Sequence, residues 1–282
     1  MKFGAYLYGL EPSALRQVAV QAENLGYESL WRGDHLVIPV EYTSALKLSA
    51  GTPIGHTTPL YDLVALFGYL AASTKTIRLA TGVLVLPVRD PFNTARAIMT
   101  LDRLSGGRVI AGVGAGWIKE ESQAVGLDFS SRIARMIEGI EVMKLLWTEP
   151  TPKYSGNHYR FDAVGFEPKP IQQPHPPIVI GGESRISLSA AARHGDGWFG
   201  HFQPWSALEE KLDGLLRLRR EFNRMELPFE VSLMAPVNLS VSDLHRLAES
   251  GVDRVVIAFG NMNQTDATAI LPDLERVADR LL

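Results

Sequence analysis

Residues 77–113 read IRLATGVLVLPVRDPFNTARAIMTLDRLSGGRVIAGV and contain two strand-like runs with a helical segment between them. The first run, over 77–86, is apolar at nearly every position, as in a strand buried on both faces of a parallel sheet. Apolar residues recur three and four positions apart over 92–104, which indicates an amphipathic helix. The turn Ser105-Gly106-Gly107 then leads into a second strand over 108–113. This order predicts a strand–helix–strand unit with parallel strands.

The same alternation continues toward both ends of the chain. Strands are predicted over 2–8, 29–33, 77–86, 108–113, 177–180, 197–200, 229–237 and 253–259. Helices are predicted over 13–25, 60–73, 92–104, 130–147, 187–193, 205–222, 241–250 and 270–281. Eight such units in 282 residues predict a single α/β domain over 1–282, a closed (β/α)8 TIM barrel, which typically needs about 250 residues. The segments 36–58 and 149–176, the latter with a hairpin-like stretch over 154–161, interrupt the rhythm and are interpreted as insertions.

Composition excludes several classes of function. The 28 Lys and Arg against 31 Asp and Glu give a net charge of −3, so neither nucleic acid nor a membrane surface is expected as a partner. The absence of cysteine excludes disulfides and thiolate metal sites, and the seven histidines show no metal-ligand spacing. No run reaches the ~20 apolar residues of a membrane helix, and no signal peptide is evident. A cytoplasmic protein with a small-molecule substrate is expected.

Functional groups of such a barrel lie where its strands end. The second strand ends at Asp34 and His35. Because imidazole titrates near neutral pH, His35 is a candidate catalytic proton carrier, and Asp34 is a candidate cofactor anchor. The alternative is that Asp34 braces the following loop and His35 is only a polar neighbour.

Glycines mark the ends of the next two strands. Gly82, between Thr81 and Val83, indicates either a bulge or the close approach of a ligand. Gly114 and Gly116, which precede Trp117, remove side chains from one face of the chain. That face could accept a flat ring with Trp117 as a wall, or it could serve tight packing of the barrel. A dinucleotide fingerprint is excluded, because Trp117 stands where its last glycine is required.

The fifth strand ends in Gly181, Gly182, Glu183 and Ser184 and opens a helix. Bare glycines, a hydroxyl and free amides at a helix start are suited to a phosphate group. The alternative is that Ser184 merely caps the helix, and an inward-turned Glu183 would repel a phosphate. The candidate substrate pocket is completed by Tyr6, Trp117, Glu120 and His201.

Five segments together resemble the luciferase-like monooxygenase superfamily, and within it the coenzyme F420-dependent oxidoreductase branch. They are GYESLWRGDHLVIP (26–39), IRLATGVLVLP (77–87), LDRLSGGRVIAGVGAGWIKEE (101–121), FEPKPIQQPHPPIVIGGES (166–184) and ARHGDGWF (192–199). The resemblance implies a bacterial luciferase-like barrel, usually dimeric, in which residues 34 and 35 meet the cofactor ring. It also implies a non-prolyl cis peptide at Gly82–Val83 and a phosphate held at 181–184. Some relatives carry an acidic residue at the position of Trp117, for which Glu120 is the nearest substitute.

Three functions follow as expectations. The first is hydride transfer between coenzyme F420, a deazaflavin, and a small organic substrate, with His35 as the proton carrier. The alternative is an FMN-dependent two-component monooxygenase that uses O2 and reduced flavin supplied by a separate reductase. The third is a cofactor-binding barrel without turnover. The identity of the substrate stays open.

Overall fold

The computed structural model describes residues 1–43, 54–260 and 266–281. Within these ranges eight parallel strands close into a barrel, since the last strand pairs with the first, Phe259 opposite Leu7. The barrel strands in spatial order are β1 (Lys2–Leu7), β2 (Ser29–Arg32), β3 (Arg78–Thr81), β5 (Val109–Gly114), β8 (Ile178–Gly181), β9 (Gly197–His201), β10 (Glu230–Pro236) and β11 (Arg254–Phe259). The predicted TIM barrel is thereby confirmed.

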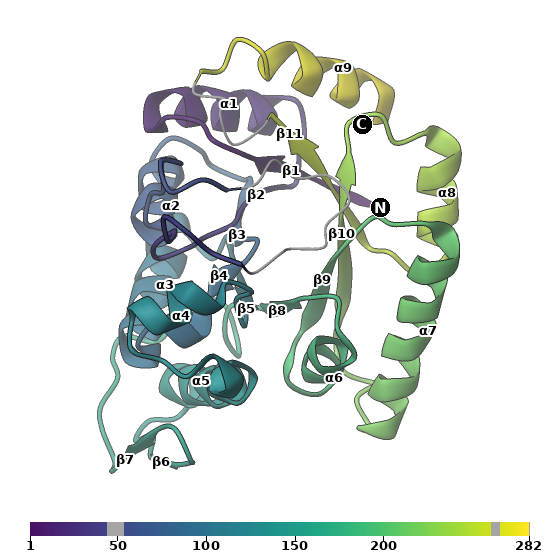
Figure 1. The fold of residues 1–282 in the computed structure, drawn as a ribbon. Coiled ribbons are helices and arrows are strands. Elements are labelled where there is room, and N and C mark those ends of the chain that lie inside the picture. Colours follow the sequence, from purple (N-terminus) through teal and green to yellow (C-terminus); the bar gives the residue numbers. More distant parts are fainter. Residues whose placement is uncertain (44–53, 261–265, 282) are drawn as a thin grey trace.

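Helices surround the barrel (Figure 1). They are α1 (Pro12–Asn24), α2 (Leu63–Ala71), α3 (Pro91–Ser105), α4 (Lys119–Ala124), α5 (Arg132–Thr148), α6 (Arg185–His194), α7 (Trp205–Glu221), α8 (Val241–Glu249) and α9 (Leu271–Leu281). Their apolar residues pack on the outside of the barrel at helical spacing, as Leu274, Val277 and Ala278 do in α9. In the described residues no helix is both long and apolar enough to cross a membrane.

The structure corrects the sequence prediction at the third strand. The single strand predicted over 77–86 is broken into β3 and β4 (Leu84–Val85), followed by the 3-10 turn η1 (Leu86–Val88). The break is the cis peptide Gly82–Val83, as the family resemblance implied. Backbone pairing continues across it, because the Gly82 N–H donates to the Arg32 carbonyl at 2.7 Å and the Asp34 N–H donates to the Val83 carbonyl at 3.2 Å.

Short elements follow the fourth barrel strand, β5, and the helix α5. Helix α4 and the 3-10 turn η2 (Phe129–Ser131) precede α5, and α4 was not anticipated because six residues are too few to show a helical period. The hairpin expected over 154–161 is present as antiparallel β6 (Tyr154–Ser155) and β7 (Arg160–Phe161). Figure 1 shows it outside the barrel, beside α5.

The barrel interior is filled, so chemistry is confined to the end where the strands finish. Its apolar layer is formed by Tyr6, Trp31, Ala80, Ile110, Val179, Phe199 and Val256. At the other end of the strands, the fully buried Arg254 pairs with Glu28 and Glu230, each at 2.9 Å, and donates to Ser232. The C-terminal ends of the strands, called the mouth below, are therefore where the functional groups of such a barrel are expected.

Candidate active site at the mouth of the barrel

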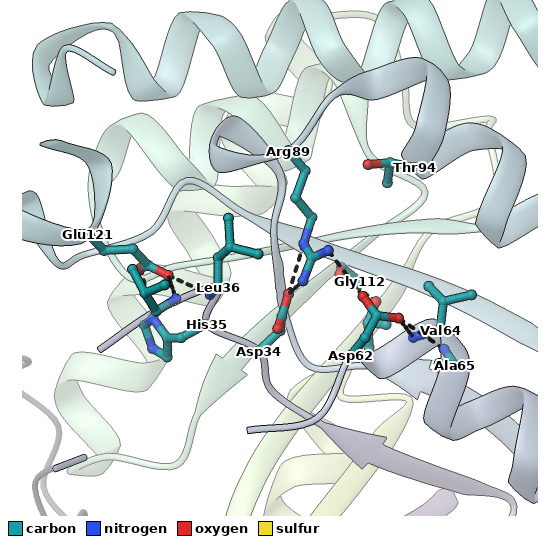
Figure 2. A network of polar contacts seen from close by, with 12 residues as sticks. Asp34, His35, Leu36, Asp62, Val64, Ala65, Arg89, Thr94, Gly112 and Glu121 are labelled. Carbon is teal, nitrogen blue, oxygen red and sulfur yellow. Dashed lines mark hydrogen bonds and ion pairs between the residues drawn. The ribbon is translucent and has the colours of Figure 1, made fainter. Parts of the chain in front are cut away.

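A buried histidine–carboxylate pair lies beside the end of β2. The His35 Nδ1 is 2.9 Å from Oε2 of Glu121, which belongs to α4, and the two side chains are 8% and 1% exposed. The other oxygen, Oε1, accepts the Leu36 N–H at 2.7 Å (Figure 2). An oxygen that accepts from the imidazole requires the proton on Nδ1, so Nε2 is left as the basic nitrogen.

Glu121 was not among the predicted site residues, whereas its neighbour Glu120 was. Glu120 instead accepts hydrogen bonds from the backbone N–H and the hydroxyl of Thr43, both at 2.9 Å. It thereby ties α4 to the segment that follows β2. Trp117 meets the His35 ring edge to face, with centroids 5.6 Å apart, and so forms a wall beside this imidazole.

Asp34 is held by an arginine that the sequence did not single out. Arg89, directly after η1, donates to Oδ2 of Asp34 from Nη2 at 2.7 Å and from Nε at 3.1 Å, and it also lies 3.2 Å from Asp62 (Figure 2). Burial raises the pKa of Asp34, and the charge and hydrogen bonds of Arg89 only partly oppose the rise. Asp62 is the N-cap of α2, so Arg89 links the segment after η1 to the end of β2 and to the start of α2. Asp34 therefore braces the loop, which was the alternative interpretation of the sequence.

The glycines of the mouth make room for valines of the chain itself. A Cβ added at Gly114 or Gly181 would lie 2.6 or 2.8 Å from a methyl group of Val83, and one at Gly116 would lie 2.7 Å from Val85. The face opened by Gly114 and Gly116 is therefore taken up by packing, which was the competing interpretation. The half-buried Val83 remains as an apolar surface on which a flat ring could lie.

Thr81 and Tyr6 pack within the barrel next to Val83 and the glycines of the mouth. The Thr81 hydroxyl donates to the Gly112 carbonyl at 2.6 Å and so serves the packing of β3 against β5. Tyr6 lies in the apolar layer and burial raises its pKa, so it stays protonated at neutral pH.

Helix α6 begins at the mouth with the predicted glycine–serine segment. Ser184 is its N-cap and accepts the Ser187 N–H at 3.1 Å, as the simpler alternative required. Gly182 has φ +124°, and an added Cβ would lie 2.7 Å from the Ser187 hydroxyl, so only glycine fits there. The tight turn brings the first amides of α6 to the mouth, where an anion would be stabilised.

The carboxylate of Glu183 is neutralised by its neighbours and does not stand alone near that helix start. It accepts from Lys211 of α7 at 2.6 Å and from the backbone N–H of His201 at 2.8 Å, and His201 Nδ1 lies 3.2 Å away. Burial pushes the Glu183 pKa up, but these hydrogen bonds outweigh burial and hold it at about 2. Lys211 was missed because nothing distinguishes it from the other charged residues of its helix.

The described part of the chain contains no group of three or more acidic or histidine side chains arranged to hold a metal ion. The groups that the mouth does offer are the imidazole of His35, the apolar surface of Val83 and the start of α6. This combination suits an organic cofactor that carries a flat ring and a phosphate.

Residues 2–276 match the luciferase-like monooxygenase family. An uncharacterized protein of Mycobacterium tuberculosis is 32% identical over 293 residues, covering 100% of this chain and 99% of the relative. An FMNH2-dependent dimethylsulfone monooxygenase of Pseudomonas putida is 31% identical over 158 residues, 55% of this chain and 43% of the relative.

Among solved structures, an F420-dependent secondary alcohol dehydrogenase superposes with a TM-score of 0.79 at 16% identity, covering 99% of this chain and 97% of that one. The fold is therefore shared over the whole barrel. The resemblance carried by the five segments is confirmed, and the chain belongs to the luciferase-like monooxygenase family and is an oxidoreductase.

Proposed function

We propose that this oxidoreductase uses coenzyme F420 and transfers a hydride between the cofactor and a small organic substrate at the mouth. The observation that carries the proposal is the buried His35–Glu121 pair. The Nδ1 atom of His35 is hydrogen-bonded to Glu121 at 2.9 Å, so its Nε2 atom is left to exchange a proton. Interconversion of an alcohol and a carbonyl needs such a proton carrier at the substrate oxygen, since the hydride leaves or joins the carbon. The solved F420-dependent alcohol dehydrogenase with the same fold supports this choice.

The mouth fits the cofactor in two respects. Val83 offers an apolar surface for the ring, and the turn at Gly182 offers the amides of α6 for the phosphate, with Glu183 already neutralised by Lys211. When bound, a deazaflavin accepts or supplies the hydride. The chain's own part is to orient the substrate beside Trp117 and to take the hydroxyl proton on His35 Nε2 during oxidation, or return it during reduction.

A second candidate is an FMN-dependent monooxygenase that uses reduced flavin from a separate reductase. The Pseudomonas putida relative, named for FMNH2, favours it. Both cofactors are tricyclic rings with a phosphate, so the same residues would hold either. A homodimer is proposed for both candidates and is tested by light scattering of the purified protein.

Binding of the two cofactors to the purified protein decides between the candidates. Titration with F420 and, separately, with FMN and reduced FMN is followed by quenching of tryptophan fluorescence. We expect F420 to saturate the protein with an affinity at least about ten-fold higher than either form of FMN, a difference of about 1.4 kcal/mol. Saturation by reduced FMN alone would establish the monooxygenase and overturn the F420 proposal.

The His35→Ala variant tests catalysis against mere binding of the cofactor. We expect cofactor affinity to stay within about two-fold while turnover falls by about 10²-fold, the usual contribution of a general acid or base. Turnover equal to that of the wild type would remove His35 from the mechanism.

A further inference from the structure

One buried arginine at the rim of the mouth has no partner among the described residues. Arg32 is the last residue of β2 and only 8% exposed, its Nη1 is buried without a hydrogen-bond acceptor, and the side chain donates no hydrogen bond and forms no ion pair there. Three other arginines have one unpartnered buried nitrogen, but each donates through another nitrogen; they are Arg132, Arg219 and Arg224. Arg32 is therefore the exception among the buried cations.

The acids near Arg32 are bound to other groups. Glu11 accepts the hydroxyl of Tyr61 at 2.6 Å, and Asp34 accepts both of its hydrogen bonds from Arg89. Burial lowers the pKa of the Arg32 guanidinium, and the nearby Tyr6, Tyr61 and Glu11 only partly offset this. A buried charge without a partner destabilises a fold, so its presence calls for an anion supplied from outside.

The surroundings place this cation on the outer side of β2, among the loops at the mouth end of the barrel. Trp31 points into the barrel, so Arg32 leaves the strand on the opposite face, toward the segments that carry Glu11 and Tyr61. Glu11 follows β1 and precedes α1, and Tyr61 precedes α2, so both belong to loops on the mouth side. Arg32 and His35 are three positions apart in the chain, so their Cα atoms are separated by at most about 10 Å.

We propose that Arg32 binds an oxyanion, a carboxylate or phosphate group, of a ligand seated at the rim of the mouth. The planar guanidinium suits two-pronged binding of such groups. If the ligand is the substrate, it is an organic acid whose charged group binds at Arg32 while its reacting carbon lies at His35. The identification of the substrate as an organic acid rests on the proposed function, whereas the binding of an oxyanion by Arg32 does not.

The binding test uses the purified protein without cofactor. Sodium acetate and inorganic phosphate are titrated separately by calorimetry at constant ionic strength, with chloride as the reference ion. We expect saturable binding of at least one of them, weakened at least about ten-fold in Arg32→Met and unchanged in Arg217→Met, which removes an exposed arginine of α7. No saturable binding, or equal binding by wild type and Arg32→Met, would overturn the proposal.

The stability of Arg32→Met toward urea shows whether Arg32 binds a ligand or stabilises the fold. Without added anion, Arg32→Met should be at least as stable as the wild type in urea, because it removes a buried charge for which residues 1–43, 54–260 and 266–281 supply no partner. Added anion should raise the urea midpoint of the wild type only. A variant that is much less stable without anion would assign Arg32 to the fold and overturn the proposal.

The source of the anion follows from cofactor affinity. In Arg32→Met, unchanged affinity for F420 and FMN identifies the substrate as the source, and an affinity reduced at least about ten-fold identifies the cofactor phosphate. Failure of the wild type to bind F420 would contradict the proposed function and leave the acetate and phosphate result standing.

Discussion

At the scale of single residues, the site depends on which of two adjacent carboxylates faces the mouth. Successive residues of a helix point about 100° apart, so Glu120 and Glu121 cannot share a role. Glu121 is buried against His35 and the Leu36 N–H, and Glu120 contacts Thr43. The sequence could not show which of the two carboxylates is buried against His35, because a helix of six residues has no period from which its buried face can be read.

Glu121→Gln, with Glu120→Gln as its matched control, tests whether this carboxylate positions His35. The amide has one acceptor oxygen where the carboxylate uses two, so the Nδ1-protonated tautomer of His35 should lose its preference. We expect kcat to fall by about 10²-fold in Glu121→Gln, with cofactor affinity unchanged, and by less than about two-fold in Glu120→Gln. Nitrogen-15 NMR of His35 reads the tautomer directly; an unaltered tautomer in Glu121→Gln would contradict the positioning role.

Glu183 makes the free energy of unfolding depend on pH. Its folded-state pKa of about 2 lies below the ordinary value of about 4.3, so its hydrogen bonds stabilise the fold fully above that ordinary value. This stabilisation is lost as the pH falls from about 4.5 toward 2. Urea unfolding of the wild type and Glu183→Gln should differ most at pH 6 to 7 and converge near pH 2; a constant difference across this range would exclude the effect.

At the scale of elements, the start of α6 combines a structural cap with the proposed phosphate site. A substitution at Gly182 would not test phosphate binding alone, because any side chain there would collide with Ser187 and strain the turn. Ser184 is the better probe, since its removal takes away one hydroxyl at the helix start.

Ser184→Ala should be compared with Ser240→Ala, which removes the N-cap of α8. Each substitution should lower the free energy of unfolding by about 1 kcal/mol, as loss of an N-cap usually does. Only Ser184→Ala should also weaken binding of the cofactor in a fluorescence titration, by about ten-fold if its hydroxyl contacts the phosphate. Equal affinities in the two variants would remove Ser184 from the cofactor site.

At the scale of the whole molecule, the two ends of the barrel carry different groups: a buried ion-pair cluster lies where the strands begin, and the proposed site lies where they end. Arg254 is fully buried at the start of the strands, where it neutralises Glu28 and Glu230, far along the strands from His35 and Val83. Removing Arg254 takes this partner from Glu28 and Glu230, which are half-buried, and Glu230 keeps an ion pair with Lys2.

Arg254→Met should therefore lower the free energy of unfolding by about 2 kcal/mol without changing cofactor affinity. The control is Arg246→Met, which removes an exposed ion pair with Glu209 and should cost less than about 1 kcal/mol. Urea unfolding and cofactor titration of both variants provide the measurements. A change in cofactor affinity in folded Arg254→Met would show that the two ends are coupled.

The order of strands and helices and the closed barrel were available from the sequence. The place of the site at the strand ends is still a prediction. The periods of strands and helices and the turns between them are local, so neighbouring residues suffice to reveal them. The motif resemblance added the family and the cis peptide at Gly82–Val83, both of which the comparisons and the structure confirm.

Only the tertiary structure decided which side chains meet. His35 and Glu121 are 86 residues apart, Asp34 and Arg89 are 55 apart, and Glu183 and Lys211 are 28 apart. No periodicity relates such positions, because their contact depends on how the strands close and how each helix turns on the barrel. For the same reason the sequence could not show that Arg32, directly before Gly33-Asp34-His35, is buried without a partner in the described part of the chain.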